Sequence, residues 1–241
     1  TNIANWALIG PTNKWAMFDV LRNTKSTAPL GITVVLTPAT RCDSIALSGL
    51  VGASVRVTAS SAIAGGAVYD SGIVTLSSRT TSGWYSYYFG SFRTRTEFVR
   101  RDLPPYADLV ITVVVSAAVG DVSIGSCIVG MSRYLGSTSY DATNEALNFS
   151  TISRNSNGDS LLVPKRNIPQ TQQVLWASKS YIDDILAVRS LLNGAVAAWY
   201  GLDDDTDGYF SSLFVVGIYK EMTINASYPL DAKINLTLEE V

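Results

Sequence analysis

Histidine is absent from the 241 residues of the chain. A Ser-His-Asp triad, a Cys-His pair, an HExxH zinc site and any metal site with an imidazole ligand are therefore excluded. Charged residues are also scarce, since they make up 16% of the chain but roughly 25% of an average soluble domain. The formal net charge is only −2, from 18 basic and 20 acidic side chains. A protein that follows nucleic-acid phosphates needs a basic patch, so this composition argues against nucleic acid as a partner.

Long apolar runs are missing as well, so the sequence predicts no membrane span. The segment from Thr1 to Trp15 has no basic region followed by an apolar one, so we expect no signal peptide. The two cysteines, Cys42 and Cys127, favour two buried free thiols in a reducing compartment over one disulfide bridge. Apolar residues, in contrast, make up 47% of the chain. So much apolar content with so few charges indicates a large core and a surface that is partly covered in an assembly.

The first half of the chain predicts a β-sandwich or jelly roll over residues 1–132. Short β-branched segments are separated by Gly, Pro and Ser at intervals typical of all-β domains. The segment Ala53–Ala59 alternates, so Val55 and Val57 are expected to face the core while the residues between them face solvent. The other expected strands are Leu30–Leu36, Ser44–Leu50, Ala67–Tyr69, Gly72–Leu76, Trp84–Phe89, Glu97–Arg101, Leu109–Ser116 and Val122–Val129.

Residues 133–172 differ in composition, being rich in Ser, Thr, Asn and Gly, and are expected to form an extended arm with short strands. Asn157-Gly158 is a strong hairpin-turn signal, and Phe149–Arg154 and Ser160–Pro164 are expected to flank it as strands. A structureless linker of this length is unusual in a compact domain. We therefore expect the arm to pack on a neighbouring subunit.

Residues 173–241 predict a small α+β unit with one main helix. That helix is expected over Ser180–Asn193, with Ser180 as its N-cap. The fold class is therefore mainly β: an N-terminal β-sandwich or jelly roll, an extended arm, and a small α+β C-terminal unit. The strands expected in this last unit are Gln173–Ala177, Phe210–Tyr219, Met222–Tyr228 and Lys233–Leu238.

The densest group of charges is the run from Asp203 to Gly208 (DDDTDG), which matches the first half of an EF-hand loop. Asp203, Asp205 and Asp207 stand at alternate positions, as ligands of a hard cation such as Ca²⁺ would. Position twelve is Phe214 instead of the glutamate that an EF-hand needs, and no helix is expected before the loop. The pattern therefore favours an acidic, solvated turn, with a calcium site as the alternative.

The densest group of aromatic side chains is the segment Trp84–Phe89 (WYSYYF). As a strand it would have two faces, one with Trp84, Ser86 and Tyr88 and the other with Tyr85, Tyr87 and Phe89. Aromatic rings are enriched in cores and subunit interfaces, which is the favoured interpretation. An exposed aromatic row also stacks on sugar rings. The candidate contact residues for a carbohydrate or a protein partner are Trp84, Tyr85, Tyr87 and Tyr88.

The sequence indicates no catalytic site. It contains no G-x-S-x-G, no Walker A and no G-x-G-x-x-G pattern. A pair of glycosidase carboxylates leaves no mark in a sequence because the pairing is spatial. Glu97, Asp102, Asp108 and Glu221 stand in no motif and are expected to be surface charges. The chain is therefore expected not to be an enzyme.

The opening segment, Asn5–Asp19 (NWALIGPTNKWAMFD), combines two tryptophans, a Gly-Pro turn and an apolar stretch. Trp15, Met17 and Phe18 are expected to plug one end of the sandwich. This segment resembles one near the N-terminus of tailed-bacteriophage virion proteins, which are tail or baseplate components with a carbohydrate-binding-like jelly roll. The further segments that resemble this family are Ser44–Val57, Asp102–Tyr106, Ile124–Gly136 and Val216–Lys220.

The resemblance implies a structural component of a phage tail, at the baseplate or the tail tip of the virion, assembled in the host cytoplasm. Its implied partners are other tail proteins and further copies of itself in a trimer or hexamer, because a tail tip favours three- or six-fold rings. One alternative is a receptor-binding module that holds a host surface polysaccharide on the aromatic strand face. A polysaccharide depolymerase is less favoured. The family provides neither catalytic residues nor a cofactor, and the acidic loop is not part of the resemblance.

Overall fold

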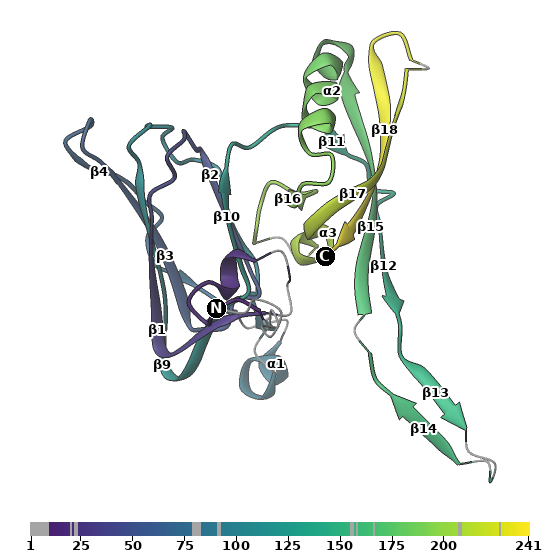
Figure 1. Ribbon diagram of the computed structural model, residues 1–241. Helices are drawn as coiled ribbons and strands as arrows, with labels where there is room; N and C mark the ends of the chain where they lie inside the picture. Colours follow the sequence, from purple (N-terminus) through teal and green to yellow (C-terminus); the bar gives the residue numbers. More distant parts are fainter. Residues whose placement is uncertain are drawn as a thin grey trace, which may run out of the picture. The chain divides into compact units, whose positions relative to one another are not determined.

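The computed structural model describes residues 10–19, 21, 24–78, 83–90, 93–154, 157, 159–165, 167–206, 209–226 and 228–241. The chain divides into two compact units, Thr1–Ser132 and Arg133–Val241 (Figure 1). Both units consist mainly of antiparallel strands, so the prediction of a mainly β fold with one main helix is confirmed. Within the described ranges, none of the helices has the length and apolar character needed to cross a membrane.

The first unit is a β-sandwich of two antiparallel sheets. The larger sheet has the strand order β1-β9-β3-β4, with β5 also paired to β3, and the smaller sheet has the order β10-β2-β8. The strands of the larger sheet are β1 (Ser26–Leu36), β3 (Ser54–Ser61), β4 (Gly66–Asp70), β5 (Val74–Thr75) and β9 (Val110–Ile124). Those of the smaller sheet are β2 (Ser44–Ser48), β8 (Phe98–Arg100) and β10 (Ser126–Gly130). The remaining elements are the 3-10 turn η2 (Ala16–Phe18), the helix α1 (Trp84–Phe89) and a short pair, β6 (Ser77–Ser78) with β7 (Arg93–Thr94).

One core lies between the two sheets. Strand β3 alternates as expected, with Val55 and Val57 fully buried and Arg56 exposed. Strands β2 and β8 of the smaller sheet contribute Leu47 and Phe98, both also fully buried. These residues belong to a single apolar cluster, so the alternation in the sequence correctly predicts the faces that meet in the core.

The chain passes from the larger to the smaller sheet at Gly125, between β9 and β10. The Gly125 N–H donates to the Ser48 carbonyl (2.9 Å), and a Cβ at Gly125 would lie only 3.0 Å from that same oxygen. The backbones approach so closely here that a side chain would require the Ser48 and Gly49 backbone to shift. The segment Val122–Val129, expected as one strand, is therefore divided into the end of β9 and the strand β10.

The segment before β1 covers one edge of the sandwich. Met17 is buried in the core, as expected, and its N–H donates to the Ser26 hydroxyl of β1 (3.1 Å), while η2 also contacts β10. Trp15 and Phe18 were expected to be plugs as well, but both are exposed. The reason is the short 3-10 turn, which buries Ala16 and Met17 and leaves the two flanking rings outside. Asn5 to Ile9 of the same segment lie outside the described residues.

The second unit is a six-stranded antiparallel sheet with the order β11-β15-β18-β17-β16, and β12 also pairs with β15. Its core lies on one face, where Leu175, Ile234 and Leu236 meet Ile185 of the helix α2. The elements of this sheet are β11 (Ser137–Thr138), β12 (Thr143–Asn148), β15 (Asn167–Ser178), β16 (Ala197–Tyr200), β17 (Phe214–Asn225) and β18 (Asp231–Glu240). The helical elements are η3 (Lys179–Tyr181), α2 (Ile182–Leu191) and α3 (Phe210–Leu213).

Three features of this unit differ from the expected ones. Phe210–Tyr219 and Met222–Tyr228, expected as two strands, are joined in the single strand β17, which ends at Asn225. The main helix starts at Ile182, and Ser180 lies in the preceding η3 turn, so Ser180 is not the N-cap. The Lys179 N–H donates to the Leu230 carbonyl (3.0 Å), which continues the pairing of β15 with β18 by one residue into η3. The first residues of the expected strand Phe210–Tyr219 form α3 instead, because one helical turn brings Phe210 into contact with Phe214, with ring centres 5.7 Å apart.

A two-stranded ribbon extends from the sheet of the second unit (Figure 1). Strands β12 and β15 pair as far as Asn148 and Asn167, and the ladder continues through β13 (Thr151–Arg154) and β14 (Ser160–Val163). Strand β18 accompanies β15 only from Gln170 onward, so residues 146–169, called the ribbon below, have no third strand among the described residues. At the usual strand rise the ribbon is about 30 Å long. The predicted hairpin around Asn157-Gly158 is confirmed by this pairing, and Gly158 itself lies outside the described residues.

Candidate functional site

The outer half of the ribbon presents apolar side chains on both faces. Opposite residues of a ladder share a face, so Ile152 and Leu162 lie on one face, and Leu161 and Val163 lie on the other. All four are exposed; Ile152 retains 66% of its accessible surface and Val163 retains 40%. The Ser150 hydroxyl joins the two strands across the gap between β12 and β13, since it accepts from the Lys165 N–H (3.0 Å).

This geometry suits docking on another protein surface. A strand that is apolar on both faces is typical of strands that are covered on both sides, and a lone two-stranded hairpin is only marginally stable in water. The hairpin is predicted by the sequence, but Leu161 and Leu162 are not among the expected contact residues. The signal that would have found them is the apolar triplet Leu161–Val163 within a stretch that is otherwise polar.

The aromatic segment is a helix, α1, and the expected strand face is wrong. The Tyr87 N–H donates to the Gly83 carbonyl (3.0 Å), which closes the first turn. Trp84 stacks on Tyr88, with ring centres 6.3 Å apart and planes inclined by 16°, and Tyr85 contacts Phe89. Such contacts between residues four apart are those of a helix. Aromatic residues favour strands mainly where a pleated, half-buried surface packs against them.

The four candidate contact residues, Trp84, Tyr85, Tyr87 and Tyr88, are all exposed, and Trp84 retains 80% of its accessible surface. Trp84, Tyr87 and Tyr88 line a shallow hollow of about 500 Å³ together with Gly83. Their rings are therefore available to a ligand or to a partner surface. The core alternative for this segment is wrong, whereas contact with a sugar or with a neighbouring subunit stays a prediction.

The acidic loop shows turn geometry in its described part. The carboxylate of Asp204, which is not one of the expected ligands, accepts from the Thr206 N–H (2.8 Å) and hydroxyl (2.7 Å). Phe214, at position twelve, is buried against Phe210 and offers no ligand. No group of three or more acidic, cysteine or histidine side chains that could hold a metal ion occurs in the described ranges. Asp207 lies outside them, so the calcium site formed by Asp203, Asp205 and Asp207 stays a prediction.

All four carboxylates weighed as glycosidase candidates accept hydrogen bonds, and Glu221, which is exposed as expected, accepts from the Thr223 hydroxyl (3.2 Å). Asp108 accepts from the Ser61 hydroxyl (2.7 Å) and the Ile63 N–H (2.9 Å) at the turn after β3; these bonds lower its pKa. Asp102 accepts from the Tyr69 hydroxyl (2.8 Å). Glu97 was expected on the surface but is buried, and it accepts from the Thr96 hydroxyl (2.6 Å). A buried carboxylate requires hydrogen bonds, and Glu97 has one from its own neighbour.

Both cysteines are buried and free, which confirms the expected thiols. Burial raises the pKa of Cys127 to about 12, and burial, followed by the adjacent Asp43 charge, raises the pKa of Cys42. Nucleophilic cysteines need a lowered pKa and access to solvent. Neither thiol therefore has the character of a catalytic or redox-active cysteine.

Comparison of the sequence with protein-family models and with curated proteins gives no match. A comparison of the fold with solved structures gives a partial overlap with a chain from a "virion of native gene transfer agent (GTA) particle". The overlap covers 45% of this chain and 96% of the other, at 11% sequence identity and a TM-score of 0.32. A TM-score this low indicates neither a common fold nor a common function. The functional argument therefore depends on the residues of this chain.

Proposed function

We propose that this chain is a non-enzymatic structural subunit of a bacteriophage tail, at the baseplate or tail tip, and that it acts through contacts between subunits. The observation that carries the proposal is the ribbon, whose apolar residues Ile152, Leu161, Leu162 and Val163 are exposed although they have the pattern of covered strands. The low charge of the chain supports it, because surfaces that become buried on assembly are poor in charges. The likeness of Asn5–Asp19 to tail and baseplate proteins supports the location in the tail.

The two parts of the molecule have different roles in this proposal. The sandwich is a rigid block, because its two sheets share one fully buried core. The ribbon supplies the reach, because it extends about 30 Å beyond the third strand of its own sheet. A ribbon that docks on a different surface of the next copy makes a heterologous contact, and such contacts close into rings when the rotation fits. A trimeric or hexameric ring is the expected product.

The test compares the wild-type chain with a variant whose ribbon is shortened. Asn148 and Asn167 face each other in the ladder, so an Asn-Gly turn placed between them closes a two-residue hairpin without residues 149–166. We expect the mass of the wild type in sedimentation velocity to rise with concentration to a multiple of 25.9 kDa, and the shortened variant to remain monomeric with the same circular dichroism. A wild type that remains monomeric up to its solubility limit would falsify self-assembly through the ribbon.

A second candidate function, binding of a host surface polysaccharide, is favoured by one observation. Trp84 and Tyr88 present nearly parallel, exposed rings beside a shallow hollow, and sugar rings stack on such surfaces. We expect a Trp84→Ala variant to lose binding on an array of bacterial surface glycans if the wild type binds. A Tyr140→Ala variant is the matched control, because Tyr140 is fully exposed in the second unit. Absence of wild-type binding would leave α1 as a contact for protein.

A further inference from the structure

Strand β1 forms one edge of the larger sheet, and its outer side has no partner strand among the described residues. The start of this edge is already occupied, because the Asn13 side chain both donates to the Thr27 carbonyl and accepts from the Thr27 N–H, each at 2.7 Å. The Asn13 amide thus occupies the place of a neighbouring peptide group. Beyond the irregularity at Leu30, no residue that the structure describes makes a hydrogen bond of this kind to the outer side of Gly31–Leu36.

The hydrogen-bond alternation shows which residues present backbone groups at this free edge. The Ser116 carbonyl of β9 accepts from Ala53 on the β3 side (2.8 Å), so its neighbour Val115 turns toward β1. Val115 pairs with Ile32, and the pairing then alternates along the ladder. Thr33 and Val35 are therefore the residues whose N–H and C=O groups point away from β9.

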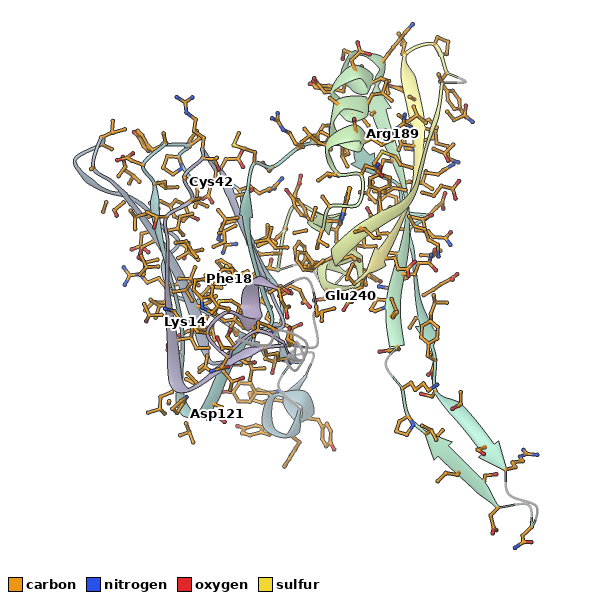
Figure 2. The ribbon with its side chains drawn as sticks, in the orientation of Figure 1. Lys14, Phe18, Cys42, Asp121, Arg189 and Glu240 are labelled. Carbon is orange, nitrogen blue, oxygen red and sulfur yellow. The ribbon has the colours of Figure 1, made fainter. Side chains whose placement is uncertain are left out.

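A groove of about 700 Å³ follows this edge. Its walls are Gly31–Leu36 of β1 and the segment before it, including Lys14, Trp15 and Phe18. Trp15, Phe18 and Val35 are exposed, so the groove offers apolar side chains beside backbone groups that have no partner strand among the described residues. Figure 2 shows Lys14 and Phe18 on the segment before β1, and the Lys14 ammonium lies 5.4 Å from the centre of the Trp15 ring.

The opposite edge of the same sheet differs in a way that supports a partner for β1. Strand β4 is only five residues long, and Asp70 at its end forms an ion pair with Arg56 (2.6 Å). Short edge strands with charges prevent unwanted pairing. The stretch Gly31–Leu36 has no charge and no proline, so β1 lacks these protections along the part that faces the groove.

We propose that β14 of a second copy of this chain adds to the outer edge of β1 and lies in this groove, an inference that depends on the proposed assembly function. Strand β14 has the required features: it is uncharged, its Leu161 and Leu162 are exposed on opposite faces, and its outer side is unpaired among the described strands. Asp159 directly before it has the opposite charge to Lys14. Main-chain hydrogen bonds supply the affinity in such strand addition, and side-chain pockets supply the specificity.

A second copy is the occupant to which the ribbon geometry points. The tip carrying β14 extends about 30 Å beyond the third strand of its own sheet, so that sheet does not cover the exposed Leu161 and Leu162. Strand β14 and the outer edge of β1 are different surfaces of the same chain, so each copy both adds a strand to one neighbour and receives a strand from another. This heterologous contact repeats around a ring until it closes.

The inference is tested by cross-linking two differently tagged copies of the full-length chain with a short bismaleimide reagent. One copy carries Val35→Cys and the other carries Leu162→Cys, while the native Cys42 and Cys127 are buried and remain in place. The matched control replaces Val35→Cys by Ile73→Cys, because Ile73 is at least as exposed as Val35 in the first unit but lies off this edge. We expect a mixed dimer at least about tenfold more abundant than in the control.

The outcomes separate this inference from the assembly proposal. Equal yields from both pairs, with the wild type still associating in sedimentation, overturn the strand addition and leave the assembly function standing. In a third variant that carries both Val35→Cys and Leu162→Cys on one chain, a cross-link found only within that chain places the ribbon on its own copy and overturns the proposal of a second copy. A wild type that never associates overturns both proposals.

Thr33→Pro provides a second measurement. It removes an N–H that points away from β9, so an edge strand tolerates it, whereas an added strand loses a hydrogen-bond donor. We expect Thr33→Pro to keep its circular dichroism and to weaken association at least about tenfold relative to Thr33→Val, which retains the N–H. Equal association of the two folded variants overturns the strand addition. If Thr33→Pro does not fold, the cross-linking result alone decides whether β14 of a second copy adds to β1.

Discussion

Replacement of Leu161 and Leu162 by serine is predicted to weaken self-association without changing the stability of the monomer. The two side chains keep 59% and 61% of their surface in the free chain. Full burial of a leucine side chain stabilises by about 1.5–3 kcal/mol, so covering the remaining surface of both contributes about 2–4 kcal/mol. That free energy corresponds to a dissociation constant raised roughly 30- to 700-fold in the double variant.

The measurement is sedimentation equilibrium of the wild type and the double variant, with urea unfolding of both at a concentration where each is monomeric. Leu191→Ser is the matched control, because Leu191 is at least as exposed on α2 but belongs to no ribbon. The dissociation constant for self-association of the Leu191→Ser variant should remain within about threefold of the wild-type value. A double variant that associates as tightly as the wild type would show that the exposed ribbon leucines are not in the contact. An equally large loss of self-association affinity in Leu191→Ser would show that the effect is not specific to the ribbon.

Three further predictions concern the isolated chain. Phe98 is fully buried in the sandwich core, so Phe98→Ala should lower the free energy of unfolding in urea by about 3–5 kcal/mol. Val119 is exposed, so Val119→Ala should change that free energy by less than about 0.5 kcal/mol. Equal effects of the two substitutions would contradict the assigned core. Burial raises the pKa of Cys127 to about 12, so its thiol should resist Ellman's reagent at about pH 9 until denaturant is added, and rapid labelling of the native chain would contradict its burial. The hydrogen bonds and charge of Arg56 hold the pKa of Asp70 down at about 2, so Asp70 stabilises the fold above its unfolded pKa of about 3.9 and loses that effect as pH falls through about 2. Urea unfolding across pH should therefore show wild type and Asp70→Asn diverging above about pH 4 and converging near pH 2, and a constant difference would contradict the ion pair.

Local patterns predicted much of the strand content. Val55 and Val57 alternate with polar neighbours, and the structure buries both in the sandwich core. Asn157-Gly158 between two apolar segments correctly indicated the hairpin of β13 and β14. Such features depend on residues close together in sequence, which is why the sequence alone shows them.

The aromatic segment could not be assigned from the sequence. Trp84–Phe89 lacks the polar residues that would distinguish a two-residue from a 3.6-residue period, because five of its six side chains are aromatic. Aromatic residues take their strand preference from packing on a sheet, and that packing is decided by distant parts of the chain. The same limit applies to Glu97, which stands in no recognisable pattern and is buried by the surrounding sandwich.

The outer edge of β1 shows a further limit of prediction from sequence, and it also supports the proposed assembly. The sequence predicted a strand over Leu30–Leu36, but an uncharged β-branched run has the same pattern in the middle of a sheet as at its edge. Its edge position follows from pairing with β9, which lies far away in the sequence. An uncharged edge on β1 and an uncharged, exposed strand β14 would each promote aggregation of a free monomer. A chain that carries both is more stable against uncontrolled aggregation when the two surfaces cover each other in a closed ring, and this is the physical reason for treating them as two halves of one contact.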